Sequence, residues 1–164
     1  MRLFRSLFGK EPIKATDDEF VSPVNGILMD ISRVPDESFS KKVMGEGFAV
    51  ESNDGYIFSP VDGEVVMIFP TSHAIIIKSK GGLEVLVHMG IDTVDLNGDG
   101  FEIFIKKGDK VKAGDKLACM DIKMFKSRGF TTCIPIIATN LTDGRVFSVE
   151  EGPVKSGEKG RIRY

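Results

Sequence analysis

The chain has 164 residues, of which 41% are hydrophobic and 28% are charged, and its formal net charge is −2. This length fits one domain with a substantial buried core, and the near-neutral charge balance argues against nucleic acid as a partner. The two cysteines, Cys119 and Cys133, stand in apolar segments without metal-type spacing, which argues against a disulfide-built scaffold and a zinc knuckle.

The chain shows neither a signal peptide nor an apolar run long enough to cross a bilayer. Cysteines without a disulfide framework are typical of a reducing compartment. We therefore expect the protein to be cytoplasmic.

Residues 1–19 differ in character from the rest of the chain. The apolar side chains of residues 1–10 share one face of a helix, and basic residues lie on its other faces. One interpretation is a weak anchor on an anionic membrane surface, and the other is a terminal segment too short to hold a helix in water. Residues 9–19 have the polar composition of a linker, so we expect a tail and linker over residues 1–19 and one domain over residues 20–164.

From Phe20 onwards, short apolar runs alternate with turn residues about every eight to twelve positions. That rhythm is typical of an all-β sandwich or barrel, and the 18 glycines of the chain serve the turns. Helical periodicity is brief, because only residues 37–43 have room for a turn or two of helix. We expect little helix elsewhere.

A weak internal repeat indicates duplication within the fold. The segment VSPVNGILMDI at residues 21–31 recurs as FSPVDGEVVMI at residues 58–68. Pro-Val-Asx-Gly followed by alternating apolar residues indicates a turn that enters a strand. A second unit, KGDKVKAGDKL at residues 107–117, is echoed by EGPVKSGEK at residues 151–159 and indicates tight turns between strands.

The only two histidines of the chain, His73 and His88, flank one predicted β-hairpin. Apolar runs at residues 75–77 and 83–87 form its strands, and the intervening Lys-Ser-Lys-Gly-Gly contains the glycines that a tight turn needs. A hairpin of this kind brings residues that are distant in sequence into direct contact.

The register of this hairpin decides where the histidines point. A turn centred on residues 80–81 makes His73 face His88, and directly opposed side chains lie about 5 Å apart. In this register we expect the two imidazoles to share a face with Ile75 and Leu86. A slip of one residue should send the two rings to opposite faces of the sheet.

A neighbouring pair of histidines suits phosphoryl transfer. A neutral imidazole nitrogen attacks phosphorus, and the resulting P–N bond is labile once the ring is protonated, so histidine carries the group only transiently. The second ring, oriented by a hydroxyl such as that of Thr71, can stabilise the phosphoryl oxygens. The carbonyl of Gly90 is a plausible partner for the other nitrogen of His88, since glycine allows the chain to fold back there.

Two other interpretations of the pair stay open. The histidines could be polar residues on a sheet surface without a chemical role. A zinc site is a further option, but two histidines plus Asp92 lack a convincing fourth ligand. We therefore expect no bound metal, and nothing in the sequence calls for another cofactor.

Three motifs give the chain a resemblance to a known family. They are FPTSHAI at residues 69–75, LVHMGIDTVDL at residues 86–96 with GDGF at 98–101, and GDKVKAGD at residues 108–115. Together they resemble the glucose-type enzyme IIA component of the bacterial phosphoenolpyruvate-dependent sugar phosphotransferase system, over about residues 20–164. The resemblance implies an antiparallel β-sandwich of barrel-like form.

The same resemblance implies a function in sugar transport. The protein would be a phosphotransferase that carries a phosphoryl group on histidine from one protein to another. The donor would be the histidine phosphocarrier protein, and the acceptor would be a cysteine on the enzyme IIB domain of a sugar permease. Regulatory protein targets are a further class of partner that the family implies.

The resemblance assigns roles to five positions. It implies that His88 is phosphorylated through Nε2 and that His73 steadies the phosphoryl group. Thr71 and Gly90 match positions that support the phosphoryl site, and Asp92 matches an acidic residue that meets basic groups on partners.

A partner-binding rim around the histidines is also implied. Its apolar members would be Phe39, Val43, Met44, Phe69, Ile76, Leu86 and Val94. The acidic Asp36 and Asp92 can steer basic partners toward them. Each apolar member could instead belong to the sandwich core, and Leu86 and Met89 stand where phenylalanine is frequent in the family, which bears on partner preference.

Two rival functions remain. SPVDG at residues 59–63 and MDIKM at residues 120–124 also resemble biotinyl and lipoyl carrier domains, in which Lys123 would be the modified residue of a hairpin. Ile122 in place of a methionine and the length of the chain count against this interpretation. A non-catalytic binding module is the other rival, and it predicts that neither histidine is phosphorylated.

Overall fold

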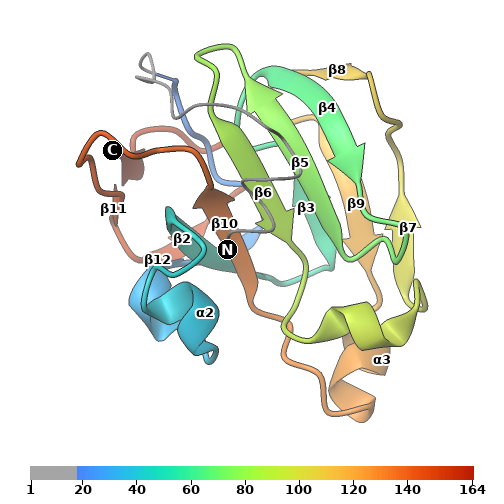
Figure 1. Ribbon diagram of the computed structural model, residues 1–164. Helices are drawn as coiled ribbons and strands as arrows, with labels where there is room; N and C mark the ends of the chain where they lie inside the picture. Colours follow the sequence, from blue (N-terminus) through green and yellow to red (C-terminus); the bar gives the residue numbers. More distant parts are fainter. Residues whose placement is uncertain (1–17) are drawn as a thin grey trace.

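The computed structural model describes residues 18–164, and their dominant structure is antiparallel β-sheet (Figure 1). The eight strands of the largest sheet are β1 (Gly26–Asp30), β2 (Glu46–Ser52), β4 (Gly63–Ile68), β5 (Ala74–Ser79), β6 (Glu84–His88), β8 (Lys110–Val111), β10 (Ile134–Ala138) and β12 (Gly152–Val154). Their order in the sheet is β12-β1-β2-β10-β6-β5-β4-β8.

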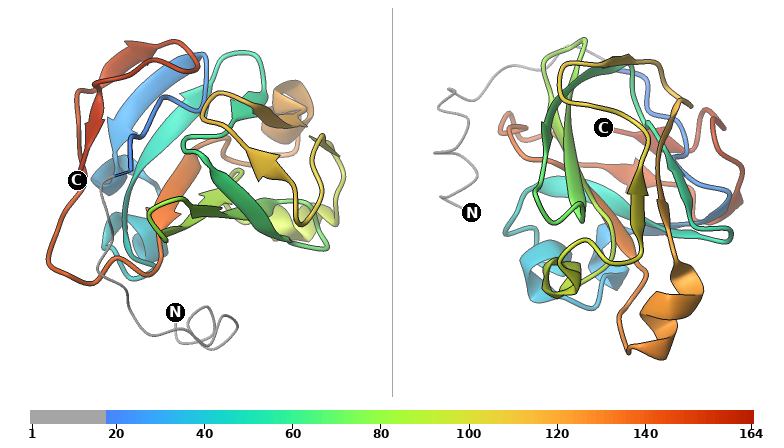
Figure 2. Two further views of the ribbon diagram at one scale, coloured as in Figure 1. Left: turned by 90° about the horizontal axis from the view of Figure 1, so that it is seen from above. Right: turned by 90° about the vertical axis from the view of Figure 1, so that its right-hand side faces the viewer.

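Two smaller sheets complete the β structure of the described residues. One contains β3 (Tyr56–Phe58), β9 (Lys116–Met120) and β7 (Phe101–Ile103), in that order, and the other pairs β11 (Ser148–Val149) with β13 (Ile162–Arg163). The predicted fold class is confirmed: the sheets of residues 18–164 form a sandwich-like body that stops short of a closed barrel (Figure 2).

Within residues 18–164, four short helical segments interrupt the strands. They are the 3-10 turns η1 (Ile31–Arg33) and η2 (Thr93–Leu96) and the helices α2 (Glu37–Ser40) and α3 (Ile122–Ser127). Figures 1 and 2 show α2, α3 and the segment that follows β6 at the same end of the molecule. Helix α2 lies inside the predicted window of residues 37–43.

The sequence pattern does not predict α3. Its first turn is closed by Asp121, whose Oδ1 accepts a hydrogen bond from the Met124 backbone N–H at 3.0 Å. Phe125 anchors the helix in the core, with its ring centroid 5.0 Å from that of Phe101. The segment is helical because of this tertiary contact and its cap rather than because of an extended apolar period.

The internal repeat corresponds to two copies of one local structure. In the first copy the hydroxyl of Ser22 donates to the carbonyl of Val24 at 2.9 Å, and in the second Ser59 donates to Val61 at 2.6 Å. Both serines and both valines are fully buried. Each copy turns the chain into a strand of the large sheet, β1 and β4, as the pattern predicts.

The Gly-Asp units form the tight turns expected of them. Asp109 accepts a hydrogen bond from the backbone N–H of Lys106, and Asp115 accepts one from Lys112, both at 2.9 Å. The carboxylate of Glu158 makes the equivalent bond in the echo near the C-terminus. In each turn an acidic side chain satisfies a backbone donor three residues before it.

The large sheet has apolar clusters on both of its faces. The inner cluster fills the space between the sheets and contains Phe48, Ile57 and Leu117 among others. The second cluster, which we call the outer cluster, comprises Ile31, Val34, Phe39, Ala49, Ala74, Ile76, Leu86, Ile91, Cys133 and Ile137. Strands β5, β6 and β10 are consequently buried on both sides, because η1 and α2 contribute side chains that cover the outer face.

The predicted register of the histidine hairpin is wrong by one residue. His88 pairs with Ala74, and Lys78 pairs with Glu84. The connecting loop holds three residues, 80–82, because the Ser79 N–H donates to the Leu83 carbonyl at 2.8 Å. Gly82 takes the left-handed conformation with φ +94°, so the turn belongs to the three-residue type that ends in a left-handed glycine.

Asp18 attaches the start of the described chain to the domain. Its backbone N–H donates to the Tyr164 hydroxyl at 2.7 Å, and its carboxylate accepts from the Ser79 hydroxyl at 2.5 Å and the Gly81 N–H at 2.9 Å. We therefore propose that the domain begins at Asp18, two residues earlier than the sequence analysis expects. The predicted amphipathic tail over residues 1–10 lies outside the described residues.

We expect Asp18→Ala to lower the free energy of unfolding by about 1–3 kcal/mol, because it leaves the Gly81 N–H and the Ser79 hydroxyl without their carboxylate partner. Glu19→Ala is the matched control, since it removes only a solvent-exposed ion pair with Lys159 and should cost less than about 1 kcal/mol. Urea denaturation measures both, and equal effects would show that the Asp18 contacts add nothing.

Candidate functional site

The two imidazoles lie against each other at one end of the hairpin. Their ring centroids are 5.1 Å apart and their planes are inclined at 76°, an edge-to-face contact. His88 is the last residue of β6, whereas His73 stands one residue before β5 and follows Ser72, whose φ is +58°. The alternation of faces along a strand does not extend to His73, so the shifted register leaves the rings together.

The surroundings of the pair differ in one respect from the expected ones. Ile75 belongs to the inner cluster, on the opposite face from the histidines. Ile76 and Leu86, which pair with each other across the hairpin, lie in the outer cluster with Ala74, the partner of His88. The shift of register exchanges Ile75 for Ile76 beneath the site.

Backbone hydrogen bonds fix the position of His73. The turn from Phe69 to Ala74 is closed by the Phe69 N–H donating to the Ala74 carbonyl at 3.0 Å, and the Ser72 N–H donates to the Phe69 carbonyl at 2.8 Å. The carbonyl of His73 accepts from the Met89 N–H at 2.8 Å. The turn before β5 is thus bonded directly to the residue that follows His88.

Each ring has a defined partner for its Nδ1 atom. The Thr71 hydroxyl lies 2.5 Å from Nδ1 of His73, and the Gly90 carbonyl lies 2.7 Å from Nδ1 of His88. A carbonyl only accepts hydrogen bonds, so the proton of neutral His88 resides on Nδ1 and Nε2 carries an unshared electron pair. Both support positions predicted from the sequence, Thr71 and Gly90, touch the ring expected of them.

Two aromatic rings enclose the pair. The centroid of Phe39 lies 5.1 Å from that of His88, and the centroid of Phe69 lies 5.3 Å from that of His73. Helix α2 delivers Phe39, and Asp36 caps this helix by accepting from the Ser38 N–H at 2.8 Å. The short helix therefore places an aromatic ring and a carboxylate near one imidazole.

Burial keeps both rings uncharged at neutral pH. Burial, with the proximity of His88 acting in the same direction, lowers the pKa of His73 to about 4. The pKa of His88 is also lowered by burial, against the opposing influence of the Gly90 carbonyl and the Asp36 carboxylate. The electron pair on Nε2 of His88 is consequently available at pH 7.

The backbone conformation and the close neighbours at position 90 both require glycine. Its φ is +88°, and a Cβ at this position would lie 2.4 Å from the Thr93 methyl carbon and 3.0 Å from the Thr131 carbonyl oxygen. Only glycine combines this left-handed conformation with so close an approach. The residue type explains why its carbonyl can turn back toward His88.

Some of the expected rim is exposed beside the histidines. Val43 and Val94 are 49% and 47% exposed, large values for apolar side chains. Met44 and Phe69 are half-buried against the outer cluster. The acidic Asp92 is exposed and Asp36 is half-buried, which gives this end of the molecule apolar and negatively charged patches.

Three of the predicted rim residues do not reach the surface. Ile76 and Leu86 are fully buried, and Phe39 is 4% exposed. They belong to the outer cluster under η1 and α2, a second core that the hairpin pattern does not reveal. Ile76 and Leu86 form the floor of the site, and Phe39 contacts His88 rather than the solvent.

Two residues that shape the site, Ser72 and Thr93, carry no clear signal in the sequence. The left-handed conformation of Ser72 turns His73 toward His88, but serine carries no signal for that conformation. Thr93 is fully buried, and its hydroxyl donates to the Met89 carbonyl at 2.7 Å. The GIDT sequence after His88 is the only hint of such a contact.

Groups of metal-ligating side chains and membrane-spanning helices can both be sought in the described part of the chain. Across residues 18–164, no three His, Cys, Asp or Glu side chains come together as metal ligands. In the same range, no helix has the length and apolar character to cross a bilayer.

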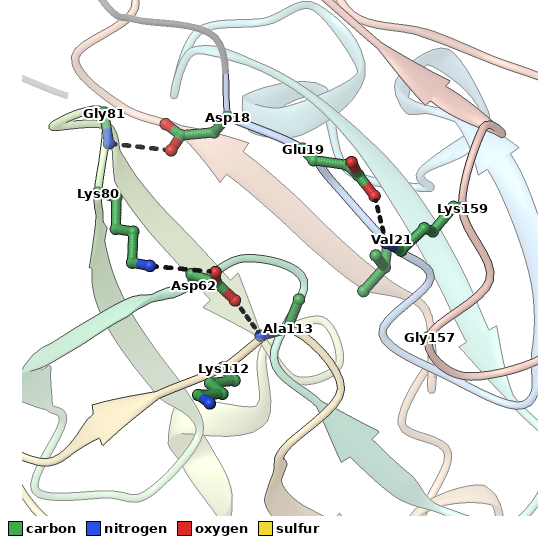
Figure 3. Close-up of a pocket in the computed structure, with 10 residues that line it drawn as sticks. All are labelled: Asp18, Glu19, Val21, Asp62, Lys80, Gly81, Lys112, Ala113, Gly157 and Lys159. Atoms are coloured by element: carbon green, nitrogen blue, oxygen red, sulfur yellow. Dashed lines mark hydrogen bonds and ion pairs between the residues drawn. The ribbon is translucent and has the colours of Figure 1, made fainter.

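A cavity of about 530 Å³ lies near the turn of the hairpin (Figure 3). The histidines are at the other end of the hairpin strands. The cavity is lined by Asp18, Glu19, Val21, Asp62, Lys80, Gly81, Lys112, Ala113, Gly157 and Lys159. Lys80 pairs with Asp62 at 3.5 Å, and Lys159 pairs with Glu19 at 3.1 Å. The acidic and basic groups that line the cavity largely neutralise one another. None of the predicted site residues lines the cavity.

Comparison with known proteins identifies the class. The family model described as "phosphoenolpyruvate-dependent sugar phosphotransferase system, EIIA 1" matches residues 18–144, which is most of the chain. The chain therefore belongs to this EIIA family. It is a phosphotransferase and a phosphocarrier of the sugar phosphotransferase system, as the resemblance of its histidine motifs predicts.

Individual relatives agree with this assignment. The glucose-specific EIIA component of Halalkalibacterium halodurans is 40% identical over 98% of this chain and 96% of its own length. The glucosamine-specific EIICBA component of Bacillus subtilis is 45% identical over 81% of this chain but only 21% of its own. The solved structure of glucose permease IIA from Mycoplasma capricolum superposes with a TM-score of 0.82 at 37% identity, covering 90% of this chain and 96% of that one.

The family match favours the phosphocarrier over the biotinyl or lipoyl carrier. The structure adds a physical reason, because Lys123 lies on helix α3 and not at the tip of a hairpin. The lysine of such carriers is expected on an exposed turn, so the shared sequence pieces reflect related turns rather than shared chemistry.

We expect His73 to titrate with a pKa of about 4 and His88 to titrate below 6.5. Because the folded pKa of His73 is below the unfolded value, its contribution to stability is present above pH 6.5 and is lost as the pH falls toward 4. His73→Gln should remove about 2–3 kcal/mol of this acid destabilisation. NMR titration of the two histidines and urea denaturation at several pH values measure these effects, and normal pKa values would contradict them.

Proposed function

We propose that His88 accepts a phosphoryl group from the histidine phosphocarrier protein and passes it to a cysteine on the enzyme IIB domain of a sugar permease. The observation that carries this proposal is the 2.7 Å contact between His88 Nδ1 and the Gly90 carbonyl. This bond holds the proton on Nδ1, so Nε2 of the neutral ring is the nucleophile.

The two half-reactions are displacements at phosphorus. In the first, Nε2 of His88 forms a P–N bond while the P–N bond to the donor imidazole breaks. In the second, the acceptor thiolate forms a P–S bond, the P–N bond to His88 breaks, and the electron pair returns to Nε2. No other group needs to be consumed, and catalysis depends on positioning and electrostatics.

His73 steadies the transferred group in this proposal. A hydrogen bond donated by the Thr71 hydroxyl to Nδ1 of His73 leaves the ring proton on Nε2. That N–H can donate to a phosphoryl oxygen of phosphorylated His88, since the two rings are 5.1 Å apart. Thr71 is then a positioning residue that acts through the tautomer of His73.

The exposed rim provides the docking surface for both partners. Val43 and Val94 offer apolar contact, and Asp36 and Asp92 attract basic groups. A relative whose name joins EIIC, EIIB and EIIA in one component supports an EIIB domain as the acceptor. Regulatory protein partners would compete for the same rim, and the free cysteines Cys119 and Cys133 fit a cytoplasmic location.

Incubation with phosphoenolpyruvate, enzyme I and the histidine phosphocarrier protein should add one acid-labile, base-stable phosphate to the chain. His88→Ala should abolish this phosphate, because it removes the nucleophile. His73→Gln should still accept the group but pass it to enzyme IIB at a rate reduced by roughly a hundredfold, as expected for a group that positions a transferring phosphate.

Intact-mass spectrometry and a coupled sugar-phosphorylation assay measure the two outcomes. A phosphate that persists in His88→Ala would refute the assignment of the nucleophile. Unimpaired onward transfer in His73→Gln would show that His73 is a bystander. The same mass spectrum reports biotin or lipoate on Lys123, so the carrier alternative is tested at once.

Removing the negative charge of Asp92 should slow phosphoryl acceptance. Asp92→Asn keeps the fold, because asparagine tolerates the left-handed backbone at this position, where φ is +58°. At low salt we expect kcat/KM for the phosphorylated donor protein to fall roughly threefold to tenfold, and the difference to shrink as salt rises. Glu64→Gln, on β4 near the turn end of the hairpin, is the control; an equal loss in both variants would rule out local steering.

A further inference from the structure

We propose that Thr93 is a positioning residue for phosphoryl transfer, because its buried hydroxyl holds the turn that aims the Gly90 carbonyl at His88. The proposal rests on the proposed function of His88. Neither the histidine motifs nor the family description assigns a role to Thr93, which is the first residue of η2.

The hydroxyl of Thr93 holds the peptide group between Met89 and Gly90. Thr93 is fully buried, and its Oγ1 donates to the Met89 carbonyl at 2.7 Å. The N–H of the same Met89 donates to the His73 carbonyl at 2.8 Å. Met89 is thus bonded through both of its backbone polar groups, on one side to the turn of His73 and on the other to Thr93.

The methyl group of Thr93 confines the turn from a second direction. It lies 2.4 Å from the position that a Cβ of Gly90 would occupy, and the Thr131 carbonyl lies 3.0 Å from that position. The same Thr131 carbonyl accepts from the Ile91 N–H at 3.1 Å. Gly90 is therefore held between Thr93 and the segment before β10, with little freedom to rotate its peptide groups.

This confinement has a chemical consequence at His88. The Gly90 carbonyl keeps the imidazole proton on Nδ1 only while it points at that atom, at 2.7 Å. If the Met89 carbonyl is released, the turn gains freedom and the carbonyl of Gly90 leaves this direction for part of the time. The proton then moves to Nε2 in part of the population, and those molecules cannot attack phosphorus through Nε2.

Two substitutions of Thr93 distinguish the effect of its hydroxyl from the effect of its methyl group. Thr93→Val retains the shape but loses the hydrogen bond, whereas Thr93→Ser retains the hydroxyl and loses the methyl. We expect Thr93→Val to slow phosphoryl acceptance in single-turnover experiments by roughly tenfold or more, as for other groups that orient a reactive histidine, and Thr93→Ser to stay within about threefold of the original chain.

The decisive readout is the tautomer of His88, observed through the ¹⁵N chemical shifts of its ring below the melting temperature of every variant. The original chain and Thr93→Ser should show the proton on Nδ1, and Thr93→Val should show a mixture with Nε2. An unchanged tautomer and rate in Thr93→Val would overturn the proposal, as would equal losses of rate in the two variants.

The outcome also distinguishes failure of this inference from failure of the proposed function. A tautomer shift in Thr93→Val establishes the positioning of the ring whether or not phosphate is transferred. Absence of phosphate on His88 of the original chain would instead refute the proposed function, and with it the kinetic role of Thr93.

Discussion

The hydrogen bond between His88 Nδ1 and the Gly90 carbonyl is the constraint on which the proposed chemistry depends. It selects the neutral tautomer whose Nε2 carries an electron pair, and the fold is arranged to preserve it. Strand β6 ends at His88, and the left-handed backbone of Gly90 turns the chain back toward the His88 ring. Thr93 and Thr131 then confine this turn. In the proposed mechanism, the reactive atom is therefore set by backbone geometry more than by neighbouring charges.

The apolar clusters on both faces of the sheet give the site its electrostatic character. The inner cluster stabilises the sandwich, whereas the outer cluster carries the histidines at its edge and receives Phe39 from α2. Burial there lowers the pKa of both imidazoles, so charge is kept off the rings without a cationic partner. Asp36 acts in the opposite direction on His88, which limits how far its basicity falls.

Local patterns predict the elements better than they predict how the elements meet. The duplicated Ser-Pro-Val-Asx-Gly turns, the hairpin and the need for glycine at position 90 all follow from short-range chemistry, and the structure contains them. The prediction of the hairpin register is wrong because the sequence Lys-Ser-Lys-Gly-Gly is compatible with both a two-residue and a three-residue turn. The burial of Ile76 and Leu86 depends on η1 and α2, which come from another part of the chain.

The attachment of Asp18 determines where the described chain enters the domain. Its carboxylate binds the loop that joins β5 to β6, while both histidines sit at the other extremity of the same two strands. The described chain therefore enters the domain at the end remote from the two histidines. A partner that docks over the histidine pair does not meet the Asp18 contacts, so the entry of the chain and the proposed docking surface occupy separate ends of the domain.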